Sequence, residues 1–301
     1  MKKNSANIKK KLYLCNAKLY THQKLTPMNE PNRILFISQE INPYLAEETP
    51  IRMLNRQLPE WCQNAGFETR TFMPKFGDIN ERRNQLHDVI RLSGVNLIIA
   101  DADHPLLIKV ASMPATRVQI YFIDNDDYFH RRKGIADESG KEYADNDERC
   151  IFYVRGVLET VKKLRWTPSL IHCSGWMSAL APIYLKKVYA DTPFFANAKV
   201  VLALDNNEYK TPFGTSFAEK ITVEGIQPYH LRGIAGFPVG YEELMRLAID
   251  NVDAIICAGK SINQRVMNYA QTSGKPMLEF TENQEDYVAF YKRLLENDVE
   301  K

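Results

Sequence analysis

The chain has 301 residues, of which 45% are hydrophobic and 25% are charged, and its formal net charge is +2. This composition is typical of a globular protein with one large domain or two small ones, and it implies no broad basic face for nucleic acid. No apolar stretch reaches the roughly 18 residues of a membrane span, so no membrane partner is expected.

The cysteines and the N-terminal segment bear on location and boundaries. Five cysteines are scattered without CxxC pairing, which favours reduced thiols in a cytoplasmic protein over disulfides or a zinc site. Five of the seven lysines in Met1–Pro27 lie within Lys2–Lys11, and no apolar segment follows them as in a secretory signal. We therefore expect a basic, disordered tail over residues 1–30 and a single domain over residues 31–301. Whether residues 1–27 belong to the natural protein stays open, because Met28 could be the start.

The first part of the domain is expected to be rich in strands. Arg33–Ser38 has the length and apolar content of a buried strand. A helix with apolar residues at helical spacing follows over Ile51–Ala65, although Pro59 is expected to kink or break it. Further strands are predicted at Thr69–Met73, Asp88–Leu92, Asn96–Ala100, Leu106–Ala111 and Val118–Ile123.

The second part alternates strands and helices. A long helix is predicted from Asp145 or Asn146, as its cap, to Lys163. The loop from Asp205 to Gly240, at roughly 35 residues, is too long for a plain connection and should hold short helices. The remaining elements are expected at Ser169–His172, Trp176–Tyr189, Lys199–Leu204, Tyr241–Asp250, Ala254–Cys257, Ser261–Ala270, Lys275–Phe280 and Gln284–Leu295. Such repeated βα units predict a doubly wound, Rossmann-like, mostly parallel sheet with helices on both faces.

Four stretches, in this order, resemble the N-terminal half of bacterial glycogen synthases and plant starch synthases. They are RILFISQEINPYLAEETP; YFIDNDDYFHRR with YADNDERCIFYVRGVLETV; SLIHCSGWMSALAPIYLK; and VDAIICAGKSINQRV. The resemblance spans Arg33 to Ala270 and implies one half of a two-Rossmann-domain (GT-B) glycosyltransferase. Such enzymes move glucose from ADP-glucose to an α-1,4-glucan, and their N-terminal domain mainly holds the glucan.

The sequence departs from that family where chemistry is expected. The family's Lys-x-Gly-Gly-Leu loop, which approaches the donor's phosphates, is replaced by Leu45–Pro50 with adjacent Glu47 and Glu48. Two carboxylates repel a pyrophosphate. The family's His-x-His-Asp-Trp turn has become His172-Cys173-Ser174-Gly175-Trp176, and the chain stops about where the second Rossmann domain should begin. The chain is therefore expected to be incomplete as a catalyst, and its enzymatic status stays open.

The candidate site residues follow strands on the presumed ligand side of the sheet. His172 is the candidate catalytic residue; its alternative is a strand-end histidine bonded to backbone. The candidate substrate-binding residues are Tyr121, Asp124, Asn125, Ser174, Trp176, Asp205 and Asn206. Asp124 and Asn125 are also good turn formers, and Trp176 is more readily read as a core residue. No metal or cofactor is expected, since Asp101, Asp103 and His104 lack a second cluster and no GxGxxG or Walker A sequence is present.

Three hypotheses remain. In the first, the chain is a glucan synthase that acts alone or with a separate chain carrying a nucleotide-sugar domain, and an exposed apolar patch near Asp205–Gly240 is expected. In the second, it is a non-catalytic glucan-binding or regulatory subunit, with exposed aromatics such as Tyr121, Tyr128, Phe129 or Tyr209 around a groove. In the third, the C-terminal helix caps an unrelated small-molecule site, with a closed pocket under Leu45–Pro50. The expected partner is an α-1,4-glucan, and whether ADP-glucose is also bound stays open.

Overall fold

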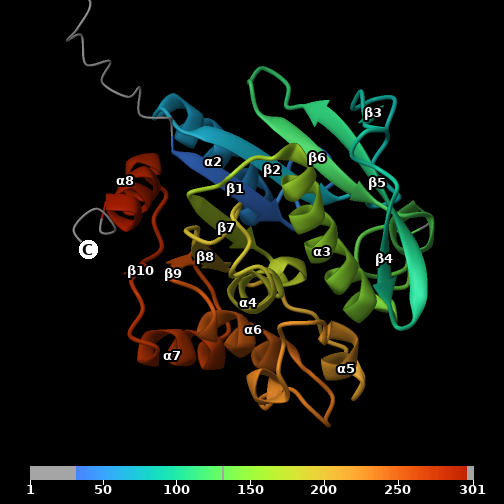
Figure 1. Ribbon diagram of the computed structural model, residues 1–301. Helices are drawn as coiled ribbons and strands as arrows, with labels where there is room; N and C mark the ends of the chain where they lie inside the picture. The colour runs from blue at the N-terminus through green and yellow to red at the C-terminus, as the bar shows by residue number, and fades with distance from the viewer. Residues whose placement is uncertain (1–31, 131, 297–301) are drawn as a thin grey trace, which may run out of the picture. The chain divides into compact units, whose positions relative to one another are not determined.

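The computed structural model describes residues 32–130 and 132–296 (Figure 1). The tail expected at residues 1–30 lies outside these described ranges. One sheet organises the described residues, with the strand order β10-β9-β8-β7-β1-β2-β6-β5-β3, while β4 pairs with β5. Pairing is parallel from β10 to β6, and β5 is antiparallel to β6, β3 and β4. The predicted mostly parallel, doubly wound sheet is confirmed.

The elements have the following bounds. The strands are β1 (Arg33–Ser38), β2 (Glu68–Pro74), β3 (His87–Asp88), β4 (Val95–Ile99), β5 (Ala102–Ser112), β6 (Gln119–Asp124), β7 (Leu170–Ser174), β8 (Lys199–Leu204), β9 (Ala254–Cys257) and β10 (Met277–Leu278). The α-helices are α2 (Pro50–Asn64), α3 (Asn146–Leu164), α4 (Ala181–Ile183), α5 (Phe217–Ile221), α6 (Tyr241–Asp250), α7 (Gln264–Thr272) and α8 (Gln284–Glu296). Shorter helical turns lie at Asp126–His130, Trp176–Ser178, Tyr184–Val188 and Pro228–Leu231.

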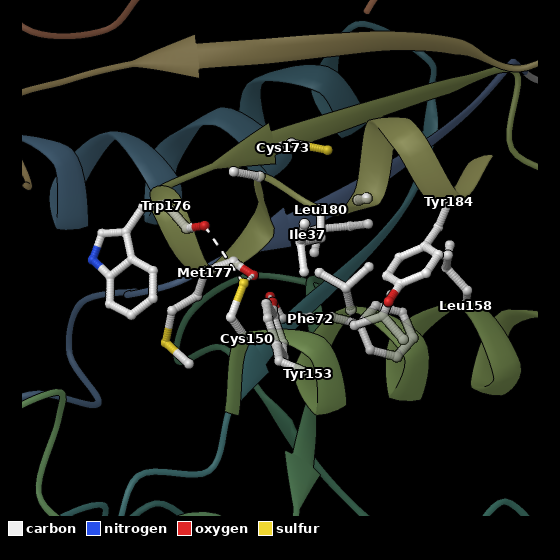
Figure 2. Close-up of a cluster of buried hydrophobic side chains, with 14 of the residues drawn as sticks. Ile37, Phe72, Cys150, Tyr153, Leu158, Cys173, Trp176, Met177, Leu180 and Tyr184 are labelled. Carbon is white, nitrogen blue, oxygen red and sulfur yellow. Dashed lines mark hydrogen bonds between the residues drawn. The ribbon is translucent and has the colours of Figure 1, made fainter. Parts of the chain in front are cut away.

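Two hydrophobic clusters cover the two faces of the sheet. Successive side chains of a strand point to opposite faces. In β1, Leu35 and Ile37 belong to the cluster that includes residues of α3, α4 and α6, whereas Ile34 and Phe36 belong to the cluster of α2 and α8. Figure 2 shows part of the first cluster, with Tyr153 of α3 beside Phe72 of β2. The Tyr153 hydroxyl donates to the carbonyl oxygen of Ser38 in β1 at 2.8 Å.

Several predicted elements differ from the observed ones. The predicted strand Asp88–Leu92 is reduced to His87–Asp88, because the following residues form a turn in which Leu92 N–H donates to the Val89 carbonyl. The predicted helix Trp176–Tyr189 is divided into three short helical pieces, and Pro182, which has no N–H to donate, lies in the first turn of the second piece, α4. Helix α7 begins at Gln264 rather than Ser261, because the Asn263 side chain caps it.

Other elements lie where the sequence predicts them. Strands β8 and β9 and helix α6 have the predicted bounds, and the long loop after β8 holds short helices as expected, namely α5 and the turn Pro228–Leu231. Helix α2 does not end at Pro59, which lies on its buried side.

The four cysteines among the described residues are buried and form no disulfide. In that same part of the chain, no helix combines the length and the apolar character needed to cross a membrane.

Candidate functional site

The turn after β7 is closed by a side chain of the neighbouring strand end. Gly175 has a φ of +81°, and a Cβ atom added there would lie 2.6 Å from Cβ of Gln39. The Gln39 N–H donates to the carbonyl of Ser174, and its Oε1 accepts from the N–H of Met177 at 3.1 Å. The sequence analysis did not predict a role for Gln39. The signal that could have suggested it is Gly175, which stands where the family has aspartate, because a glycine allows another side chain to approach the backbone closely.

His172 lies inside β7 with its side chain buried against α8. It is 1% exposed, and its Nδ1 lies 2.9 Å from the hydroxyl of Tyr291. Burial lowers the pKa of the imidazole to about 3, so the ring is neutral in the folded protein near pH 7. Its partner is a side chain, not the backbone that the alternative interpretation expected. The catalytic role of His172 stays a prediction.

Trp176 lies in the core. It is fully buried, and its ring packs on Tyr209 and Phe213 with centroid distances of 5.1 and 5.8 Å. Ser174 is buried as well, and its Oγ has no hydrogen-bond partner among the described residues. Substrate contact by either side chain therefore needs a change in the packing around it.

Unpartnered polar atoms lie on two adjacent strands, β1 and β7, and directly after a third strand, β8. Ser38 in β1 is in register with Ser174 in β7, and β7 pairs with β8. Alternation places Ser38, His172 and Ser174 on the side of Phe36 and Leu170, which belong to the α2 and α8 cluster. Ser38 Oγ, Ser174 Oγ, His172 Nε2 and Asp205 Oδ2 are all buried without a partner among the described residues. Such a concentration is unusual, because buried polar atoms are nearly always hydrogen-bonded.

Asp205 borders a pocket at the carboxyl ends of β8 and β9. The pocket has a volume of about 350 Å³ and is bounded by Thr49, Pro50, Ile51, Met53, Leu54, Gln57, Trp61, Asp205, Asn206, Ala258, Gly259, Lys260, Ser261, Phe280, Thr281, Glu282 and Tyr287. Burial, with a smaller contribution from Glu40 and Glu208, raises the pKa of Asp205 to about 7. Asn206 follows it as an exposed residue. The structure thus brings these two predicted site residues into one pocket beside Thr49 and Pro50.

The other predicted group, at the end of β6, is not among the residues that bound this pocket. Tyr121 is buried, and its hydroxyl accepts from Arg70. Asp124 is buried and accepts from the N–H of Asn125, while the Asn125 side chain accepts from two following N–H groups and donates to the Pro105 carbonyl. Asp124 and Asn125 thus make the turn contacts that the alternative interpretation predicted.

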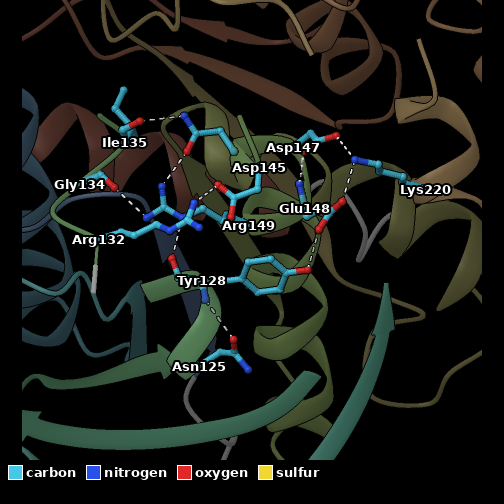
Figure 3. A network of polar contacts seen from close by, with 11 residues as sticks. Asn125, Tyr128, Arg132, Gly134, Ile135, Asp145, Asp147, Glu148, Arg149 and Lys220 are labelled. Carbon is cyan, nitrogen blue, oxygen red and sulfur yellow. Dashed lines mark hydrogen bonds and ion pairs between the residues drawn. The ribbon is translucent and has the colours of Figure 1, made fainter. Parts of the chain in front are cut away.

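The residues Asp145–Arg149 take part in an internal polar network (Figure 3). The buried guanidinium of Arg149 donates to the carbonyls of Tyr128 and Gly134 and to Oδ1 of Asn146. Asp145 occupies the N-cap position of α3 but makes no capping hydrogen bond, and it pairs with Arg132 instead. Arg149 and its hydrogen bonds therefore connect α3 to the segment that follows β6.

The loop between β1 and α2 has an acidic surface. Glu47 and Glu48 are exposed. The nearby cations are engaged, because Arg52 pairs with Glu40 at 2.8 Å and Arg56 donates to the Asn42 side chain. At the start of α2, Pro50 has no N–H and the N–H of Arg52 is bonded to Thr49 Oγ1. Little of the anion-binding capacity of a helix N-terminus is left here.

Two of the surface expectations can be compared with the structure. Tyr121, Tyr128, Phe129 and Tyr209 are 6%, 3%, 0% and 4% exposed, so the expected groove of exposed aromatics at these positions is wrong; all four rings pack into the core. In the long loop after β8, Tyr229 and Phe237 are 58% and 40% exposed. The side chains of Phe213, Phe217 and Leu231 in the same loop are buried.

Known proteins share this fold and part of this sequence. The structure superposes on the catalytic domain of starch synthase IV from Arabidopsis thaliana, which was solved bound to ADP and acarbose. The TM-score is 0.67 with 15% identity, over 83% of this chain and 51% of that one. The GT-B half expected from the resemblance is thus confirmed as a fold.

Sequence comparison extends the similarity to glycogen synthases. Those of Chlorobium limicola and Chlorobium phaeobacteroides are 38% and 37% identical over 175 residues, which make up 58% of this chain and 36% of each relative. The aligned part thus spans about a third of the length of these curated relatives. Residues 33–279 match the family model described as the starch synthase catalytic domain. Since that match covers most of the chain, the protein belongs to the starch synthase catalytic domain family.

Proposed function

We propose that this chain acts in glucan metabolism, in the cytoplasm, as a protein that binds an α-1,4-glucan and does not by itself transfer glucose from ADP-glucose. Family membership is what supports the glucan, since the aromatic groove expected at Tyr121, Tyr128, Phe129 and Tyr209 is not formed. The four cysteines of the described residues are buried and unpaired, which supports a reducing compartment. The loop between β1 and α2 supports the lack of transfer.

That loop is the observation that carries the proposal. Transfer from a nucleotide-sugar requires cationic groups or free backbone N–H groups at the leaving pyrophosphate. Here the corresponding stretch presents the exposed carboxylates Glu47 and Glu48, while Arg52 is paired with Glu40. A carboxylate beside a phosphate raises the free energy of the bound donor instead of lowering it.

Partner-assisted transfer is the second candidate. A separate chain with a nucleotide-sugar domain would supply the missing cations, and the exposed Tyr229 and Phe237 favour a contact near the long loop. In that case ADP-glucose is a substrate of the assembly. His172, Ser174 and Asp205 would then lie on this chain's side of the site.

The test uses the purified chain with radiolabelled ADP-glucose and glycogen. Label in the precipitated polymer measures transfer, and co-sedimentation of the chain with glycogen measures binding. We expect binding without incorporation above a boiled control. Incorporation that His172→Ala abolishes in a folded variant would make the chain a transferase and overturn the proposal. If the chain does not co-sediment with glycogen, the proposal that it binds a glucan is overturned.

A further inference from the structure

The pocket beside Asp205 has one wall that the family match does not include. Its inner wall comes from α2 and from the ends of β8 and β9, but Phe280, Thr281, Glu282 and Tyr287 lie beyond residue 279, where the match ends. Tyr287 is buried, and its ring lies 6.1 Å from that of Trp61 in α2. The cavity therefore depends on how the segment leading into α8 packs against α2.

The charges around this pocket disfavour an anion. Asp205 borders it, and Glu40 and Glu208 act on that carboxyl in the same direction as burial. Lys260 at the rim is already paired with Glu282 at 2.8 Å. Pro50 and the Thr49 cap remove N–H donors from the nearest helix N-terminus. An entering anion would meet negative charge with little to offset it.

The same arrangement favours a cation with an apolar body. Asp205 is 3% exposed, its Oδ1 accepts from the N–H of Asn207 at 2.7 Å, and its Oδ2 has no partner among the described residues. A buried carboxylate oxygen without a partner is costly, and an ammonium N–H compensates it better than a neutral donor. The ammonium of Lys260 lies 5.6 Å from the Phe280 ring centroid, so this rim already holds a cation against an aromatic face.

We propose that this pocket binds a small primary amine carried on an apolar, ring-sized group, with the ammonium on the Asp205 carboxylate and the ring between Leu54, Trp61 and Phe280. The volume of about 350 Å³ suits a ligand of this size. The pocket includes Asp205 and Asn206, which are also candidate substrate-binding residues, but the proposal concerns amine binding in the absence of glucan, so the glycogen experiment does not decide it.

Three probes that differ in one functional group test the proposal: 2-phenylethylamine, 2-phenylethanol and 3-phenylpropanoate. Titration of the whole chain, followed by NMR, gives a dissociation constant for each. We expect millimolar binding of the amine, about tenfold weaker binding of the alcohol, and the weakest binding of the carboxylate. Equal binding of amine and alcohol, tighter binding of the carboxylate, or no binding of the amine would overturn the proposal.

Two variants locate the site. Asp205→Asn keeps an oxygen for the Asn207 N–H, so the turn is retained, and it should abolish the preference for the amine over the alcohol. Asp127→Asn, at a carboxylate whose side chain is 74% exposed elsewhere, is the matched control and should leave the preference unchanged. A tenfold preference that survives in Asp205→Asn would contradict the assignment. If that variant does not fold, the three probes on the natural chain still decide.

Discussion

At the scale of single residues, burial shifts the pKa of two side chains beside α2 and α8 away from their ordinary values. His172 is kept neutral by burial against Phe36 and Tyr291. Asp205 is kept partly protonated at pH 7 by burial. Both pKa shifts disfavour the charged form of the side chain. Because histidine is charged when protonated and aspartate is charged when deprotonated, the two shifts change folding stability with pH in opposite directions.

For His172 the coupling appears in acid. The folded-state pKa is about 3 and the unfolded value is about 6.5. As the pH falls below the unfolded value, only the unfolded chain binds the proton, so stability is lost by about 1.4 kcal/mol per pH unit from this group alone. His172→Phe should remove that loss, measured as the free energy of unfolding in urea between pH 7 and pH 4. Tyr291→Phe, which keeps the imidazole, should retain the slope; equal slopes in both variants would refute the assignment.

For Asp205, folding stability changes with pH in the opposite direction. Its pKa is about 7 in the folded protein and about 3.9 when unfolded. As the pH rises between these values, the unfolded chain releases the proton first, so stability falls by up to about 4 kcal/mol. Asp205→Asn should flatten this fall when urea unfolding is measured from pH 4 to pH 8. The proposal of a buried, isolated carboxyl does not survive if the natural chain and the variant respond identically.

Gly175 sets the shape of the turn after β7. A side chain there meets both a positive φ and Cβ of Gln39 at 2.6 Å. Gly175→Ala should therefore cost about 2–3 kcal/mol of unfolding free energy in urea. Gly233→Ala is the control, because nothing lies within 4 Å of its added Cβ, and its effect should be small. Comparable losses in the two variants would mean that Gln39 does not close the turn.

At the scale of elements, the acidic loop between β1 and α2 is the clearest departure from the family. Replacing both exposed carboxylates, Glu47→Gly with Glu48→Gly, should strengthen ADP binding about tenfold at low salt, since two repulsive charges are removed. The gain should shrink as salt screens the remaining charges. ADP titration by calorimetry measures it. Glu138→Gly, at a side chain that is 87% exposed on another loop, should change nothing; an equal gain there would point to net charge alone.

The elements also show what the sequence could predict. Apolar content and periodicity identified β1, β8, β9 and α6, because the buried side chains of each element lie at regular, short intervals along the sequence. They failed at Trp176–Tyr189, where the apolar content is helical but Pro182 and packing on α3 divide the segment. Apolar periodicity also did not predict which candidate site residues would lie in the same pocket. Asp205 and Asn206 share a pocket with Trp61 and Tyr287 from distant parts of the chain, while Asp124 is taken up by its own turn. These contacts are set by tertiary packing, which spacing in sequence does not encode.

At the scale of the whole molecule, α8 completes the second face of the sheet. The family match ends at residue 279, yet Tyr287, Phe290, Tyr291 and Leu294 are buried with residues of β1, β7, β8 and α2. We propose that α8 and the matched residues form one folding unit. Without α8, His172 would lose its hydrogen-bond partner and part of this apolar face would be open to water.

This proposal predicts that α8 and the central strands unfold together. Phe290→Ala should lower the free energy of unfolding by about 3–5 kcal/mol, as for other buried aromatic residues, and so should Phe36→Ala in β1 on the same face. Urea transitions followed by far-UV circular dichroism and by tryptophan fluorescence should coincide in both variants. Ala289→Ser, at an exposed position of α8, controls for effects of the helix surface. If Phe290→Ala instead leaves the main transition in place while a small fraction of helix melts earlier, α8 is an independent appendage. The pocket bounded by Tyr287 would then exist only while that appendage is docked.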